Sequence, residues 1–215
     1  MKRFTYFLFL ALTLSFTACE QAGHSCCVKP TAAAAGKTTA TTVANTTGAL
    51  TDLSLYNLAS DWTNQDKQPI KLEKLRGKVQ LVAMIYTSCG YACPRTIADL
   101  QVLEHALRKY KPEELGITLV TLDPTRDTPA RLKAFAAAHH LDARRWTLLT
   151  SQPDNIQELA ALLNVKYTND FEGNISHSNV ITVLNTAGEI IYQQEGLGTN
   201  PAETVKAVEQ LQQAM

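Results

Sequence analysis

The 215-residue sequence has little cysteine and no excess charge of either sign. Five cysteines are too few for a disulfide-dense scaffold. Lys and Arg number 20, and so do Asp and Glu, which gives a formal net charge of zero. A nucleic-acid-binding protein built on a basic surface is therefore not expected. Hydrophobic residues make up 45% of the chain and charged residues 19%. This composition supports a sizeable core and excludes a wholly disordered chain.

The apolar run near the N-terminus, Phe4 to Phe16, is too short to span a bilayer comfortably. A basic pair precedes it and Thr17-Ala18-Cys19 follows it. We interpret residues 1–18 as a bacterial lipoprotein signal peptide and Cys19 as the acylated first residue of the mature protein. An ordinary secretory signal, with Cys19 incidental, is the alternative. The lipoprotein interpretation predicts a lipid-anchored protein of the bacterial cell envelope that faces the periplasm.

Residues 30–50 are low in complexity. Seven Thr and seven Ala fill 14 of these 21 positions, and no apolar periodicity is visible. We therefore predict that residues 19–52 form a lipidated N-terminus followed by a flexible tether. Residues 53–215 are predicted to form one domain.

Short apolar runs alternate with helical patterns after Leu53. Strands are predicted at residues 79–86, 117–122 and 146–149, and helices at 93–110, 127–139 and 154–163. Residues 180–184 and 189–193 flank the turn Asn185-Thr-Ala-Gly188 and are predicted to pair as a hairpin before a final helix from Pro201. This alternation predicts an α/β fold, with a central mixed sheet flanked by helices. A closing antiparallel hairpin is typical of the thioredoxin-like subclass.

Cys89 and Cys93 lie between a predicted buried strand and a predicted helix. The amides and dipole at a helix N-terminus stabilise a thiolate, which is both a nucleophile in disulfide exchange and a soft metal ligand. Three residues separate the two cysteines, so they can hold a metal, or form a disulfide if their Cα atoms lie within about 6 Å. A structural disulfide is the third interpretation, but such bridges seldom occur where α/β proteins place their sites.

A metal site needs further ligands, because Zn²⁺ prefers four whereas Cu(I) accepts two or three soft ones. His177 differs from the other four histidines because it lies in a loop rich in Gly, Asn and Ser, just before a predicted strand. Composition alone would make it a solvent-exposed residue.

Three motifs occur in an order that resembles the Sco/SenC family. They are Cys89-x-x-x-Cys93-Pro94, Asp123-Pro-Thr-Arg-Asp127-Thr-Pro129, and His177-Ser before the hairpin. The similarity runs from about Leu53 to the C-terminus. It implies a thioredoxin-like fold and binding of copper, as Cu(I) or Cu(II), through Cys89, Cys93 and His177. It also implies delivery of copper to the binuclear copper site of cytochrome c oxidase, or reduction of that site's cysteines by Cys89 and Cys93 acting as a redox dithiol.

Further roles are predicted for residues in and near these motifs. Asp123, at a strand end, is a candidate for orienting the copper ligands, and Asp127 or Thr128 is predicted to cap the following helix. Gly90 and Tyr91 stand where the family commonly has Pro and an acidic residue, so copper affinity and redox potential can differ from those of relatives. Tyr86 and Tyr91 are predicted to be packing and surface residues. The pair Cys26-Cys27 near His24 is left with three interpretations: an accessory copper ligand group, an intermolecular disulfide site, or variable tether.

We therefore expect a copper metallochaperone, a binding and delivery protein for a respiratory copper enzyme. The alternative is a thiol–disulfide oxidoreductase that keeps a partner's copper-ligand cysteines reduced. A thiol peroxidase is a third possibility, but a second cysteine four residues on, followed by Pro, does not resemble the usual peroxidatic loop. His177 discriminates, because copper binding needs it and dithiol exchange can proceed without it.

Overall fold

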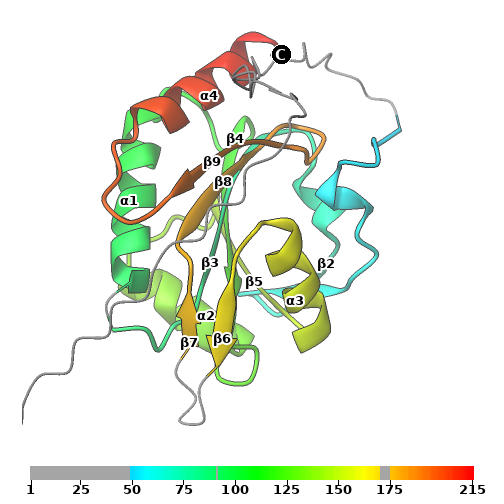
Figure 1. Ribbon diagram of the computed structural model, residues 1–215, viewed down its shortest axis with the longest axis vertical. Helices are drawn as coiled ribbons and strands as arrows, with labels where there is room; N and C mark the ends of the chain where they lie inside the picture. The colour runs from blue at the N-terminus through cyan, green and yellow to red at the C-terminus, as the bar shows by residue number, and fades with distance from the viewer. Residues whose placement is uncertain (1–48, 91, 170–174) are drawn as a thin grey trace, which may run out of the picture. The chain divides into compact units, whose positions relative to one another are not determined.

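The computed structural model describes residues 49–90, 92–169 and 175–215 (Figure 1). The predicted signal peptide and most of the tether, with Cys19, Cys26 and Cys27, lie outside the described residues, as does Tyr91. Within the described part of the chain, no helix is long and apolar enough to cross a membrane.

A seven-stranded mixed sheet forms the centre of the domain, in the order β2-β1-β5-β4-β3-β8-β9. Its strands are β1 (Trp62–Asn64), β2 (Pro69–Ile70), β3 (Val79–Ile85), β4 (Leu115–Thr121), β5 (Trp146–Ser151), β8 (Val180–Leu184) and β9 (Ile190–Glu195). Strands β3, β4 and β5 are parallel, whereas β1, β8 and β9 run antiparallel to their neighbours. The predicted mixed sheet and its closing β8–β9 hairpin are confirmed.

Helices cover both faces of this sheet (Figure 1). The elements are α1 (Ala92–Ala106), α2 (Pro129–Ala138), α3 (Pro153–Leu162) and α4 (Ala202–Gln213), with the 3₁₀ helices η1 (Leu55–Asn57) and η2 (Leu72–Leu75). Side chains of α1, α2 and α4 pack with Leu81 and Ala83 of β3 in one cluster. Side chains of α3, η1 and η2 pack with Val82 and Met84 in a second cluster. Because successive strand residues point to opposite faces, every residue of β3 is buried.

The sequence patterns missed four short strands. β1 and β2 precede β3, and β6 (Tyr167–Asn169) and β7 (Ile175–His177) form a separate antiparallel pair. Strands of two or three residues are too short to show a period-two pattern. The predicted strand at 117–122 begins earlier, at Leu115, because Leu115 and Gly116 pair with Val79 and Gln80. A Cβ at Gly116 would lie 2.6 Å from the Gln80 side chain, so this glycine makes room for a buried amide.

The β8–β9 turn depends on Gly188, which has φ +84° and lies against the Tyr56 ring. A Cβ there would lie 2.6 Å from the ring. We expect Gly188→Ala to lower the free energy of unfolding by about 2–3 kcal/mol, combining the cost of positive φ with overpacking. Gly77→Ala is the control, because Gly77 has φ +92° but open space around its Cβ position. Denaturant titration checks this, and equal losses in both variants would contradict a role for Tyr56.

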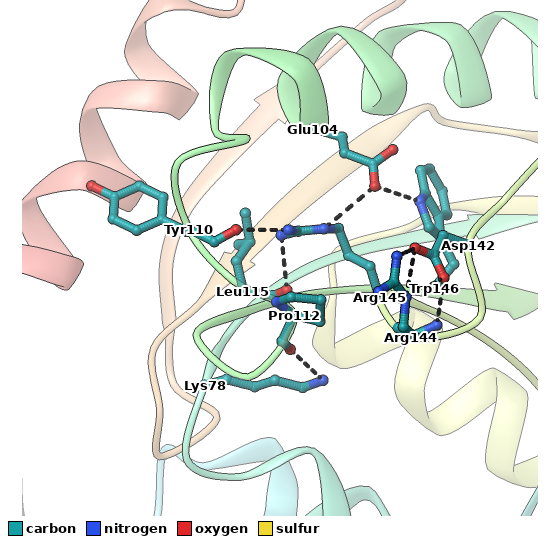
Figure 2. A network of polar contacts seen from close by, with 9 residues as sticks. All are labelled: Lys78, Glu104, Tyr110, Pro112, Leu115, Asp142, Arg144, Arg145 and Trp146. Carbon is teal, nitrogen blue, oxygen red and sulfur yellow. Dashed lines mark hydrogen bonds and ion pairs between the residues drawn. The ribbon is translucent and has the colours of Figure 1, made fainter.

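Arg145 anchors a polar network at the end of the sheet where β4 and β5 begin (Figure 2). Its guanidinium is buried and donates to the carbonyl oxygens of Tyr110, at 2.7 Å, and Leu115, at 3.1 Å. Glu104 of α1 lies 3.4 Å from the Arg145 Nε atom and accepts a hydrogen bond from the Trp146 indole. The network ties α1, the segment after it, and β5 together.

Candidate metal and dithiol centre

The two cysteines lie at the end of the sheet where β3 and β4 finish. β3 ends at Ile85, and the following loop leads to α1, in which Cys93 is the second residue. Cys93 is fully buried and Cys89 is partly buried. The predicted position at a strand-to-helix switch, where α/β proteins place their sites, is confirmed.

Hydrogen bonds bring the two sulfur atoms into one small cluster, and both are present as thiols. The backbone N–H of Cys93 donates to Cys89 Sγ over 3.4 Å. The backbone N–H of Tyr86 donates to Cys93 Sγ, also over 3.4 Å. The first turn of α1 thus holds the Cys89 sulfur beside Cys93.

The prediction that the helix N-terminus stabilises a thiolate is wrong for Cys93. Burial raises the pKa of its thiol to about 12. The N–H of Tyr86 acts in the opposite direction, and negative charge on Cys89 and Asp127 raises the pKa further. Desolvation of the charged form therefore outweighs the helix dipole, and Cys93 is a protonated thiol at neutral pH.

We expect alkylation of Cys93 by iodoacetamide to rise steadily from pH 7 to pH 10 without a plateau. The thiolate is the reactive form, and a pKa raised to about 12 means that its fraction still increases throughout this range. Mass spectrometry on a Cys89→Ser variant measures the rate at this site alone. A plateau near pH 8 or 9 would show an ordinary thiol.

His177 ends strand β7 instead of lying in a loop, because Tyr167 of β6 pairs with it across the hairpin. Its Nε2 atom lies 3.9 Å from Cys93 Sγ, and its Nδ1 atom lies 3.0 Å from the carbonyl oxygen of Ser178. A carbonyl oxygen can only accept, so Nδ1 carries the hydrogen and Nε2 presents a lone pair toward Cys93. Burial lowers the pKa of His177, which favours this neutral form.

The separation of Cys93 and His177 suits two ligands of one ion. Metal bonds of about 2.3 Å to sulfur and 2.0 Å to nitrogen allow two ligand atoms to lie up to about 4.3 Å apart. The observed 3.9 Å falls within that limit. Among the described residues, no three His, Cys, Asp or Glu side chains are already grouped as a metal site.

A hollow of about 580 Å³ lies beside His177. Residues of α3 and of the segments around β6 and β7 line it, among them Ala160, Val165, Lys166, Tyr167 and Ser176. His177 and Ser178 also line this hollow, whereas neither cysteine is among its lining residues.

Asp127 contacts the segment that leads into the cysteine loop. Its fully buried carboxylate accepts hydrogen bonds from the N–H and hydroxyl of Thr87, at 2.9 and 2.5 Å. The hydroxyl of Thr121 donates a third, at 2.6 Å. The helix cap comes from Thr128, one of the two predicted candidates, which accepts from the N–H of Arg131. The sequence pattern does not indicate this buried role of Asp127, although the Thr128-Pro129 pair can begin the helix without the Asp127 carboxylate.

Asp123 is buried and pairs with Arg126. Its carboxylate also accepts the backbone N–H of Arg126 at 3.2 Å. Its expected influence on copper ligands therefore stays a prediction.

Tyr86 packs, as predicted, and also contacts the site residues. Its ring meets the His177 ring edge-on, with centroids 5.9 Å apart and an interplanar angle of 77°. Burial raises the pKa of Tyr86 to about 12, and the neighbouring Cys89 raises it further.

The mixed sheet, the helices on both its faces and the cysteine pair where β3 meets α1 define a thioredoxin-like protein. The SCO1/SenC family model matches residues 54–213, and the chain belongs to this family. The chain is 28% identical over 147 residues to a SCO1 protein homolog of Bacillus subtilis, covering 66% of this chain and 75% of that protein.

Two solved structures illustrate the similarity in fold. The copper-bound structure of Arabidopsis thaliana ScoI has a TM-score of 0.62 at 18% identity, covering 70% of this chain and 96% of that one. A structure of BsSco, described as having a disulfide switch and as a member of the Sco family of cytochrome c oxidase assembly proteins, has a TM-score of 0.62 at 26% identity. That match covers 71% of this chain and 91% of BsSco.

Proposed function

We propose that the protein binds one copper ion through Cys89, Cys93 and His177 and delivers it to a respiratory copper enzyme. The observation that carries this proposal is the approach of His177 Nε2 to Cys93 Sγ, at 3.9 Å, beside the Cys89 sulfur. Two thiolates and a neutral imidazole form a soft three-ligand set that suits Cu(I) and is one ligand short of a structural zinc site. The copper-bound Arabidopsis relative supports the choice of metal.

Copper is the cargo in this proposal, and the thiol protons leave when it binds. Cys93 is protonated at neutral pH because burial raises its pKa, so copper must displace that proton. Uptake therefore releases protons and weakens as the pH falls. His177 already presents a neutral nitrogen and requires no deprotonation at neutral pH.

Family membership supports a proposal for the client, and the predicted signal peptide at residues 1–18 supports a proposal for the location. BsSco belongs to a group described as cytochrome c oxidase assembly proteins, and we infer that the client here is the copper-bearing subunit of that oxidase. We also propose that Cys19 carries a lipid anchor and that residues 19–52 tether the domain at 53–215 to the periplasmic side of a membrane.

An anaerobic Cu(I) competition titration tests the copper site, in a chain without residues 1–18 in which Cys19, Cys26 and Cys27 are replaced by serine. We expect one copper per chain, and about a hundredfold weaker binding in each of Cys93→Ser and His177→Ala, because each loses one of three ligands. His105→Ala, at the exposed end of α1, is the control and should bind like the parent. Binding that is indifferent to His177→Ala would refute the ligand assignment.

A second candidate function is dithiol exchange with the client. The Cys93 N–H holds the Cys89 sulfur next to Cys93, so the pair is placed to form a disulfide. In such a step a client disulfide is reduced to two thiols while Cys89 and Cys93 are oxidised to a disulfide. The disulfide switch described for BsSco favours this candidate. It predicts that His177→Ala retains the reduction of a model disulfide and that Cys89→Ser abolishes it.

A further inference from the structure

The proposed copper chemistry makes no use of the hollow beside His177. Its volume of about 580 Å³ lies within the range of roughly 300–1,000 Å³ that is typical of ligand pockets. Helix α3 and the β6–β7 pair supply its walls, and α3 lies beside β6 in Figure 1. Of the three proposed copper ligands, only His177 lines the hollow. A molecule held there would therefore lie against the imidazole side of the proposed copper site.

The charges and hydrogen-bond donors of the lining favour an anion. Lys166, whose side chain is exposed, is the one Lys or Arg among the ten residues that line the hollow, and none of the ten is Asp or Glu. The hydroxyl of Ser178 accepts the backbone N–H of Lys166 at 3.0 Å, so its own hydrogen can still be donated. Further hydroxyl groups come from Tyr167, Thr168 and Ser176. An ammonium group and several hydroxyl groups together suit a carboxylate.

The rest of the lining suits a peptide better than a small inorganic anion. Ala160 and Ala161 of α3 and Val165, which follows this helix, provide an apolar part of the surface. Pockets that combine apolar surface with a few polar groups use the former for contact area and the latter for orientation. A segment containing Glu or Asp can use both parts, because its aliphatic groups meet the apolar part while its carboxylate meets Lys166.

We propose that this hollow is a docking subsite for an acidic peptide segment of the client, with a carboxylate of that segment on Lys166. The proposal rests on the proposed function, in which a client protein approaches His177 to receive copper. It assigns recognition of the client to α3 and the β6–β7 pair, and it leaves copper binding and disulfide exchange to the cysteines and His177.

Titration of the reduced, copper-free protein with the peptide tetraglutamate tests this subsite, with NMR chemical shifts of the backbone amides as the readout. The protein is the same chain as in the copper titration. We expect the largest shifts at residues that line the hollow, and no saturable binding of tetralysine. Lys166→Met should weaken tetraglutamate binding about threefold to fivefold, which is the effect expected for one exposed ion pair. Ala161→Phe keeps every charge but fills the hollow, so it should abolish the localised shifts.

Lys74→Met is the matched control, because Lys74 is an exposed lysine of η2 that does not line the hollow. The amide spectrum of each variant shows whether it is folded. Localised shifts that weaken in Lys166→Met, disappear in Ala161→Phe and persist in Lys74→Met support the proposal. Shifts spread over the whole surface, equal weakening in the two lysine variants, or equal binding of tetralysine overturn it.

Failure of this proposal is distinguishable from failure of the proposed function, because the peptide titration contains no copper. Tetraglutamate binding that depends on Lys166, together with Cu(I) binding that is indifferent to His177→Ala, would retain the docking subsite and refute the copper ligands. The opposite pair of results would retain the copper site and remove the docking subsite.

Discussion

Asp127→Ala is expected to lower the free energy of unfolding by about 3–5 kcal/mol, because it removes a buried acceptor from one buried and two part-buried donors. These donors are the N–H and hydroxyl of Thr87 and the hydroxyl of Thr121. Because the Asp127 carboxylate is fully buried, solvent water does not supply the hydrogen-bond acceptor that the substitution removes. Denaturant titration of the metal-free protein measures the loss.

The same substitution should also weaken copper binding, because Thr87 lies two residues before Cys89 and the released loop must be ordered again when the metal binds. Asp66→Asn is the matched control. The partner of Asp66 is Lys133, whose side chain is 68% exposed, so the loss of stability should stay under about 1 kcal/mol. Equal losses of unfolding free energy in the two variants would show that the hydrogen bonds between Asp127 and Thr87 do not contribute more to stability than an exposed ion pair does.

Arg145→Met is expected to cost about 3–5 kcal/mol of stability while leaving the cysteine site unchanged. Removing this cation leaves two carbonyl oxygens and Glu104 without their buried donor (Figure 2). Loss of one partner of a buried ion pair is strongly destabilising, because the remaining charge is left without a counter-charge. The network lies where β4 begins, at Leu115, whereas Asp127 reaches Thr121, where β4 ends. The equilibrium between the Cys89–Cys93 dithiol and its disulfide, measured in mixtures of reduced and oxidised glutathione, should therefore match that of the parent.

Arg144→Met controls for the loss of one positive charge. The Arg144 side chain is 80% exposed and pairs with Asp142 on the surface, so its replacement should change stability little. Comparable destabilisation by the two neighbouring substitutions would mean that net charge, rather than the buried carbonyl contacts, accounts for the effect.

The long elements could be predicted from the sequence because their patterns are local. The apolar run of β3 and the periodicity of α1 follow from residues that lie next to one another in the chain. β6 and β7 could not be predicted in this way, since each has three residues and acquires its pairing from a partner across the hairpin. For this reason the sequence alone predicts a loop at His177.

The candidate site likewise has features that a local sequence pattern predicts and features that depend on residues far apart in the chain. The helix start near Cys93 could be read from the sequence, and proximity to His177 was implied only by resemblance, since 84 positions separate the two residues. Burial of Cys93 depends on side chains from several elements packed around it, so its raised pKa could not be foreseen from the helix dipole alone. The hydrogen bonds from Thr87 to the Asp127 carboxylate join residues 40 positions apart, and no local sequence pattern indicates them.

The different depths of the two sulfurs fix an order of events in any exchange with a client. Cys93 has no exposed surface, whereas Cys89 is only partly buried. An incoming client disulfide would thus meet Cys89 first: the Cys89 thiolate attacks it, one client sulfur leaves as a thiol, and the mixed disulfide joins Cys89 to the client. Cys93, held at the back of the site by the Tyr86 N–H, would then attack the Cys89 sulfur, form the Cys89–Cys93 disulfide and release the second client sulfur as a thiol. In the proposed dithiol exchange, Cys89 would therefore be the entry sulfur and Cys93 the resolving one.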